Sequence, residues 1–458
     1  MRYFILFLFS ITTLCAQQSI SQGVVVPAVQ LVPGSDDSFA IYLPRDYDES
    51  KTYSTVFMFE ESGKGAVAVQ HFTIAAELTG SIIVAPNLVV SDTLNVGLRQ
   101  SAAFINAIYE RFSVDKTRMI LAGNGRGALL ASSSAHLTGD IWGVIAMDDA
   151  YVDLSLLNAS KKTKFVILNS DEGSNYYKLN TLGALLKGKG VLEGFHIYEG
   201  PEELPQSGYL ASALTSLLLQ PNTPPEQLQA YYESDLAFGD LLYKQRKPLA
   251  AHSFANSLKS KYKGQVKDIS LQKDLFKKIR SSKSYKVQRN QRSAVRESEI
   301  LLAEDFSYYL DEDVNNAYFD NLGWWNYQMG ELDAKIDSTA SHDQERKAAI
   351  RLKKYIRGAT EAKYREMNMA STKIAQLLFV NVLRSLVNPK NSDAFIQAIS
   401  YSALEGDTNA ALFYLEELLK MGFTDYDALY EIEGTTALRI DEEYNAIIKA
   451  YLGDSKFH

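Results

Sequence analysis

The chain has 458 residues, of which 46% are hydrophobic and 22% charged, and its formal net charge is -8. This length favours two or more domains, and this composition is typical of a globular protein rather than a disordered or fibrous one. The negative balance argues against general nucleic-acid binding, which needs an excess of lysine and arginine to contact phosphate.

The first sixteen residues have the layout of a signal peptide. Arg2 precedes an apolar stretch, and Ala16 stands before Gln17 at the expected cleavage point. The stretch is short for a bilayer span, and no later apolar run is long enough to predict a transmembrane helix. We therefore expect export to the periplasm, the cell surface or the medium. Cys15, the only cysteine, would leave with this segment, so we expect no disulfide and no cysteine-bound metal.

Seven short apolar runs then alternate with helical patterns. Their apolar residues are continuous rather than alternating, which indicates strands buried on both faces of a parallel sheet. The predicted fold class is therefore α/β, with a mostly parallel sheet covered by helices on both faces in residues 17–222. The runs lie at residues 39–43, 55–59, 82–85, 119–122, 143–146, 165–168 and 195–198.

A proline-rich stretch at residues 220–225 predicts a linker, because proline stiffens the chain and ends regular structure. The pattern after it is helical, so we expect an all-α domain over residues 223–458. Residues 394–423 read as two amphipathic helices joined at Gly406-Asp407, and residues 234–258 repeat this pattern more weakly. Such helix pairs are typical of tetratricopeptide-like repeats, which offer an extended surface to a protein partner.

The segment 259–296 is strongly basic. It holds thirteen lysine and arginine residues against Asp268 and Asp274, a net charge of +11 in a chain of -8. A basic block in an acidic protein predicts contact with an acidic partner or an anionic surface, and the alternative is a solvated helix face. The residues expected to make this contact are Lys273, Lys277, Lys278, Arg280, Lys283 and Lys286.

Residues 119–128 place an apolar run before three glycines at alternate positions, Gly123, Gly125 and Gly127. A strand, a glycine-rich turn and a helix form the binding site of several enzyme families. One interpretation is the dinucleotide fingerprint G-x-G-x-x-G/A, which Gly123, Gly125 and Ala128 satisfy. Asp148-Asp149 then stands about twenty residues later, where a ribose-binding carboxylate is expected, although a plain polar turn is the alternative.

The second interpretation is a resemblance. Residues 39–222 resemble secreted esterases of the polyhydroxybutyrate-depolymerase and feruloyl-esterase type, within the α/β-hydrolase superfamily. The segments that carry the resemblance occur in the family's order, at residues 41–60, 63–87 and 109–128. The last segment resembles the run into the nucleophile elbow G-x-S-x-G, which exposes a serine on a strained strand-to-helix turn.

The resemblance implies where a catalytic triad would lie. Gly125 occupies the position of the serine, Asp171 that of the acid, and Glu202 that of the histidine. Glu61, Ser62 and Gly63, with Arg126 after the elbow, stand in the place of the oxyanion turn.

A triad acts as a unit, so a chain without nucleophile and base is expected to be a pseudoenzyme that binds or scaffolds and needs no cofactor or metal. The alternatives are an active carboxylesterase with a non-standard site and a nucleotide-binding protein. Other residues with chemical potential are expected to serve packing; they are Ser132, Ser133, Ser134, His71, His196, Trp324 and Trp325.

Overall fold

The computed structural model describes residues 20–138, 140–152, 163–201, 203–340, 342–367 and 371–457. The predicted signal peptide lies outside these residues. Within them, eight strands form one sheet in the order β1-β2-β4-β3-β5-β6-β7-β8. β2 runs antiparallel to β1 and β4, and the remaining neighbours are parallel. The strands are β1 (Val25–Gln30), β2 (Ser38–Tyr42), β3 (Tyr53–Phe59), β4 (Ile82–Pro86), β5 (Val114–Asn124), β6 (Gly143–Met147), β7 (Lys164–Ser170) and β8 (Leu192–Tyr198).

Helices cover both faces of this sheet, as the continuous apolar runs predicted. Along β3, Val56 and Met58 face one core, and Phe57 and Phe59 face the other, because side chains alternate across a strand. The first core receives α1 (Gly65–Thr79) and α5 (Ser207–Leu218). The second receives α2 (Leu94–Arg111), α3 (Arg126–Thr138) and α4 (Tyr176–Gly188). The α/β fold class and its mostly parallel sheet are confirmed.

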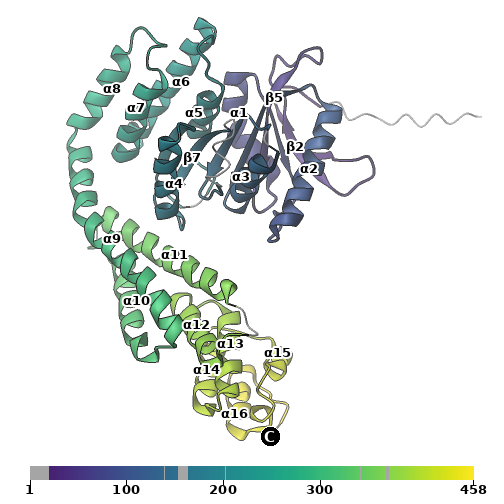
Figure 1. Cartoon of the computed structure of the whole chain (residues 1–458), viewed down its shortest axis with the longest axis vertical. Helices are drawn as coiled ribbons and strands as arrows, with labels where there is room; N and C mark the ends of the chain where they lie inside the picture. Colours follow the sequence, from purple (N-terminus) through teal and green to yellow (C-terminus); the bar gives the residue numbers. More distant parts are fainter. Residues whose placement is uncertain are drawn as a thin grey trace, which may run out of the picture.

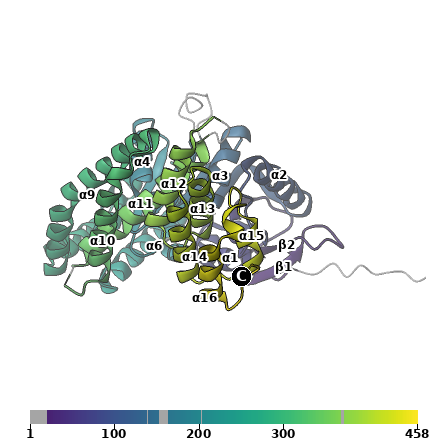
Figure 2. The ribbon, with the colours of Figure 1, turned by 90° about the horizontal axis from the view of Figure 1, so that it is seen from below.

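The regular elements described in the second half are all helices. The first three pack beside the sheet region, and the later ones extend away from it (Figure 1). α9, 34 residues long, connects the upper and lower parts of the molecule. α11 to α13 then lie side by side (Figure 2). The helices are α6 (Pro225–Lys244), α7 (Pro248–Lys261), α8 (Ser270–Ser281), α9 (Lys283–Asn316), α10 (Leu322–Asp337), α11 (Asp343–Glu366), α12 (Ile374–Val387), α13 (Ser392–Leu404), α14 (Thr408–Lys420), α15 (Tyr426–Glu431) and α16 (Glu442–Leu452), with 3₁₀ turns at Phe319–Asn321 and Leu438–Ile440.

The helix pair predicted for residues 394–423 is present as α13 and α14. Gly406 between them has a φ of +82°, which glycine adopts without strain. Asp407 follows it and caps α14 by accepting a hydrogen bond from the Ala410 amide at 2.9 Å. The weaker pattern at 234–258 likewise falls on a helix pair, α6 and α7.

The core of the sheet continues across the proline-rich stretch at 220–225. Tyr232 on α6, Phe254 on α7 and Ile279 on α8 belong to the same buried cluster as Val56 of β3. The later helices bury two further clusters of their own, one centred on Trp325 and one on α13 to α16. One buried core therefore contains residues from before and after the predicted boundary at residues 222–223.

Candidate functional site

The three glycines lie on a tight turn between β5 and α3. Gly125 has a φ of +51°, the left-handed conformation expected for the elbow position. A Cβ added at Gly123 would collide with the backbone of Gly127, and one added at Gly127 would collide with the carbonyl of Phe59. The outer two glycines therefore allow α3 to begin directly against β5 and β3, while Gly125 makes the turn.

Glu61 fills the space above Gly125. A Cβ at Gly125 would collide with the Glu61 carboxylate, which also accepts a hydrogen bond from the Arg126 amide at 3.3 Å. That amide is the first of α3, where the helix dipole favours a negative charge. Glu61 therefore lies where the side chain of an elbow nucleophile would project, and its carboxylate uses the N–H that would serve as an oxyanion donor.

The turn that carries Glu61 is held by its neighbour. Glu60 is buried, and its carboxylate accepts hydrogen bonds from the amides of Ser62 at 3.0 Å and Lys64 at 2.6 Å. Gly63 has a φ of +75° and sits against the backbone of Val89. Ser62 and Gly63 thus shape the turn, and the side chain of this turn that reaches the elbow is Glu61.

A cavity of about 270 Å³ opens beside the elbow, at the carboxyl ends of β5 and β6. This is the edge of a parallel sheet at which α/β proteins bind ligands. The Oδ1 atom of Asn124, which lines this cavity, is buried and has no hydrogen-bond partner among the described residues. The lining residues are Glu61, Asn124, Gly125, Arg126, Asp148, Asp149, Ser174 and Asn175.

Asp148 is the most constrained of these residues. Its φ is +61°, a strained conformation for a residue other than glycine, and its side chain is buried. The carboxylate accepts hydrogen bonds from the Ser170 amide at 2.6 Å and from the Tyr198 hydroxyl. Asp149 pairs with Lys178 at 2.6 Å. The Asp148 carboxylate therefore joins the ends of β6, β7 and β8, whereas Asp149 contacts α4.

Asp171 follows β7 and contacts both the turn after β8 and a helix distant in the sequence. One carboxylate oxygen accepts a hydrogen bond from the Gly200 amide at 3.0 Å, and the other lies 2.9 Å from the ammonium of Lys347 on α11. Lys347 also reaches Glu199 at 3.5 Å and Asp343 at 3.1 Å. Glu202, the predicted counterpart of the histidine, lies outside the described residues.

Burial and charge act in opposite directions on this cluster. Burial alone would lower the pKa of Lys347, but the carboxylates of Asp171 and Glu199 raise it above its ordinary value. Burial raises the pKa of Glu199, and Lys347 only partly opposes this effect. One cation thus serves three carboxylates at the junction between the sheet and α11.

A second buried pair lies one turn along α11. Arg351 binds Glu299 of α9 through two hydrogen bonds of 2.6 and 2.7 Å, and donates a third to the Asp171 carbonyl at 2.6 Å. The hydroxyl of Tyr177, on α4, donates to Glu299 at 2.6 Å. α9 and α11 are therefore attached to the sheet region by charged groups with little exposure to solvent.

The other residues noted in the sequence take part in packing. The Ser132 hydroxyl donates to the Ala128 carbonyl at 2.6 Å inside α3, and Ser133 and Ser134 are buried on the same helix. His71 contacts the Pro205 carbonyl at 3.2 Å. Burial lowers the pKa of His196, in β8, to about 4, so this ring is neutral near pH 7. Trp324 and Trp325 pack against Phe306 in the core of the later helices.

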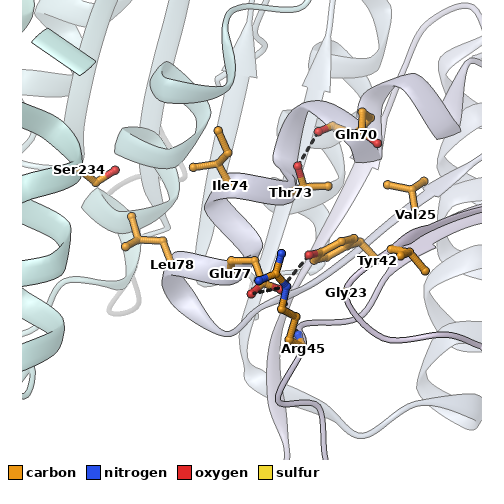
Figure 3. Close-up of a pocket in the computed structure, with 11 residues that line it drawn as sticks. Gly23, Val25, Tyr42, Arg45, Gln70, Thr73, Ile74, Glu77, Leu78 and Ser234 are labelled. Atoms are coloured by element: carbon orange, nitrogen blue, oxygen red, sulfur yellow. Dashed lines mark hydrogen bonds and ion pairs between the residues drawn. The ribbon is translucent and has the colours of Figure 1, made fainter. Parts of the chain in front are cut away.

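A larger cavity of about 790 Å³ lies away from the elbow, between α1, the β1–β2 edge of the sheet and α6 (Figure 3). Tyr42 donates a hydrogen bond to Glu77 at 2.8 Å in it, and the side chain of Arg45 approaches the same carboxylate at 3.8 Å. Burial and the neighbouring Glu77 raise the pKa of Tyr42 to about 12, so its hydroxyl stays protonated near neutral pH. These groups pair with one another, and the described lining of this cavity does not bring a nucleophile and a base together.

No protein-family model and no curated protein matches the sequence. Part of the chain aligns with several solved structures of esterases. A thermostable esterase is 11% identical with a TM-score of 0.32, over 43% of this chain and 59% of that chain. The feruloyl esterase module of Clostridium thermocellum is 13% identical with a TM-score of 0.31, over 41% and 82%. A ferulic acid esterase of Anaeromyces mucronatus is 17% identical with a TM-score of 0.31, over 40% and 86%.

The sheet region is a mostly parallel, eight-stranded sheet with helices on both faces. Each of these three structures covers less than half of this chain. Among the residues with described positions, no helix is long and apolar enough to cross a membrane. In the same set, no three histidine, cysteine or acidic side chains are grouped as metal ligands would be.

Proposed function

We propose that this chain is an exported pseudoenzyme of α/β-hydrolase fold, which acts by binding and scaffolding and does not hydrolyse esters. The observation that carries the proposal is the position of Glu61. Its carboxylate lies against Gly125, where a nucleophile would project, and accepts a hydrogen bond from the Arg126 amide.

The chemistry of ester hydrolysis is opposed at this position. Acyl transfer needs a nucleophile and N–H donors that stabilise the negative oxygen of the tetrahedral intermediate. Gly125 has no nucleophilic atom, and a carboxylate at the Arg126 amide would repel a developing oxyanion. Asp171, the residue in the acid position, is paired with Lys347. These contacts support a binding role over the alternative of an active esterase.

The carboxylate of Glu61 also opposes the alternative of a nucleotide-binding site. A dinucleotide fingerprint places a pyrophosphate at the helix N-terminus, which here is the start of α3. Glu61 already occupies that end of the helix with a negative charge. Asp148, one of the two predicted ribose ligands, is turned toward Ser170 and Tyr198. No contact of the described residues favours nucleotide binding over the pseudoenzyme.

The binding function is assigned to the helical second half. Helix pairs such as α13 and α14 stack into elongated surfaces in tetratricopeptide-like proteins, which bind other proteins along them. The charged contacts of Lys347 and Arg351 hold this region on the sheet domain. In this proposal the hydrolase-like domain supports the helical surface through these contacts.

The test is an ester-hydrolysis assay with p-nitrophenyl acetate on the native protein and on Glu61→Gln. We expect both to turn over substrate no faster than an inert protein of equal concentration. Glu110→Gln, at an exposed position of α2, is the matched control. Turnover by the native protein that is lost in Glu61→Gln and kept in Glu110→Gln would establish the non-standard esterase, with Glu61 as its base.

A further inference from the structure

α8 presents a stripe of cations to solvent. Lys273, Lys277 and Arg280 are exposed, and their spacing of four and three residues places them on one face of the helix. The opposite face buries Leu275 and Ile279 in the core shared with the sheet. The stripe is therefore fixed on a helix whose orientation is set by packing.

The stripe continues at the start of α9 through the exposed residues Lys283 and Lys286. Within the described part of the chain, no carboxylate lies within ion-pair distance of these five cations. Lys278 differs, because it pairs with Asp240 at 3.0 Å. Of the six cations expected to make a contact, five thus keep their charge available to a partner. We call these five residues, Lys273, Lys277, Arg280, Lys283 and Lys286, the basic stripe.

The opposite charge lies on the last helices of the same chain. Residues 392–457 contain thirteen aspartate and glutamate residues against four lysine and arginine residues, a net charge of -9. Exposed members of this set include Glu405, Glu431, Glu433 and Asp454. Figure 1 shows that α14 to α16 lie at the far end of the long axis from α8, so the two surfaces cannot meet within one molecule.

We propose that the basic stripe of one molecule docks on the acidic helices α13 to α16 of a second copy. The two surfaces have net charges of opposite sign, which favours their association. Every copy of the chain carries both surfaces, so the two are always present in equal amounts. Because each copy carries both surfaces, two copies can make this contact twice in a two-fold dimer, or once in a head-to-tail chain that further copies extend. This inference concerns assembly and is independent of whether the elbow hydrolyses esters.

The experiment is sedimentation velocity over a protein concentration series at about 20 mM and about 500 mM NaCl, since salt screens exposed charges. We expect self-association at low salt and its loss at high salt. Lys273→Glu with Lys277→Glu should weaken association at least about tenfold, because like charges then face each other. Lys51→Glu with Arg99→Glu, two exposed cations of the sheet region, changes the net charge equally and should leave association unchanged.

A reciprocal variant identifies the partner surface. Glu431→Lys with Glu433→Lys should also fail to associate alone. Mixed with the variant Lys273→Glu with Lys277→Glu, it should associate again. In the mixture, the glutamates introduced in the basic stripe of one variant face the lysines introduced on the last helices of the other. Loss without recovery on mixing would overturn the assignment to α13 to α16. A native protein that stays monomeric at low salt, but sediments with phosphatidylglycerol vesicles through the basic stripe, would replace the second copy by an anionic membrane surface.

Discussion

The ammonium of Lys347, on α11, lies 2.9 Å from the carboxylate of Asp171, at the end of β7. The residue in the acid position of the predicted triad therefore joins the helical half to the sheet. Both side chains are largely buried, with 7% and 14% of their surfaces exposed. In this setting, the loss of one partner leaves a charge that water cannot solvate.

Lys347→Met should lower the free energy of unfolding by about 3–5 kcal/mol, because Asp171, Glu199 and Asp343 would lose their shared cation. Urea denaturation measures the effect. Lys353 is also on α11, and it forms a more exposed ion pair with Asp333 of α10. Lys353→Met should therefore lower the free energy of unfolding by at most about 1 kcal/mol. Equal effects of the two substitutions would contradict a buried junction.

Gly125→Ser should destabilise the protein by more than the roughly 1–3 kcal/mol expected from a positive φ alone. The added side chain must also displace the carboxylate of Glu61. Gly80→Ser is the matched control, because Gly80 has a φ of +66° and no neighbour within 4 Å of an added Cβ. Thermal or urea unfolding of both variants separates the two costs.

Adding Glu61→Ala to Gly125→Ser should recover the part of the loss that is due to the collision, since contacting residues give non-additive effects. The double variant should still not hydrolyse p-nitrophenyl acetate, because no histidine has been placed beside the new serine. If Gly125→Ser and Gly80→Ser cost the same, Glu61 does not occupy the elbow in solution.

Glu199→Gln should change how stability depends on pH. The pKa of Glu199 is raised in the folded protein, so its contribution to stability is fully present below the ordinary carboxyl pKa of 4.5 and is lost as pH rises through the raised value. Glutamine cannot ionise, so the variant should gain stability relative to the native protein as pH rises from about 4.5 to neutrality.

Urea unfolding at several pH values measures this difference. The native protein and the variant share all other titrating groups, so the difference between their stabilities reports mainly on Glu199. The charged groups that act on Glu199 are Lys347, Asp171, Lys247 and Asp343. A difference in stability that stays constant across the range would show that Glu199 is not perturbed.

Limited proteolysis tests the predicted boundary at residues 222–223. Because Tyr232, Phe254 and Ile279 share a core with β3, the loop at 220–225 should be cut without release of either half under native conditions. A fragment of residues 17–222 made alone should expose this core and aggregate. A soluble, cooperatively folding fragment would favour two independent domains.

The sequence by itself determined the class of fold. Continuous apolar runs such as 55–59 can be stable only when both faces of a strand are covered, and this requirement is local to each run. The same holds for the turn at Gly125, because glycines at alternate positions after a strand predict a close strand-to-helix passage and a positive φ. The helix pair around Gly406 was likewise readable from its periodicity. β1, whose buried face is short, was not recognised.

Tertiary structure alone decided what surrounds that turn. Glu61 was visible as part of an altered turn, but only the packing of the β3 loop against α3 places its carboxylate over Gly125. Lys347 is 176 positions from Asp171 in the chain, so no spacing or motif could join them. The pairing arises because α11 folds back onto the end of β7, where burial makes a cation necessary among three carboxylates.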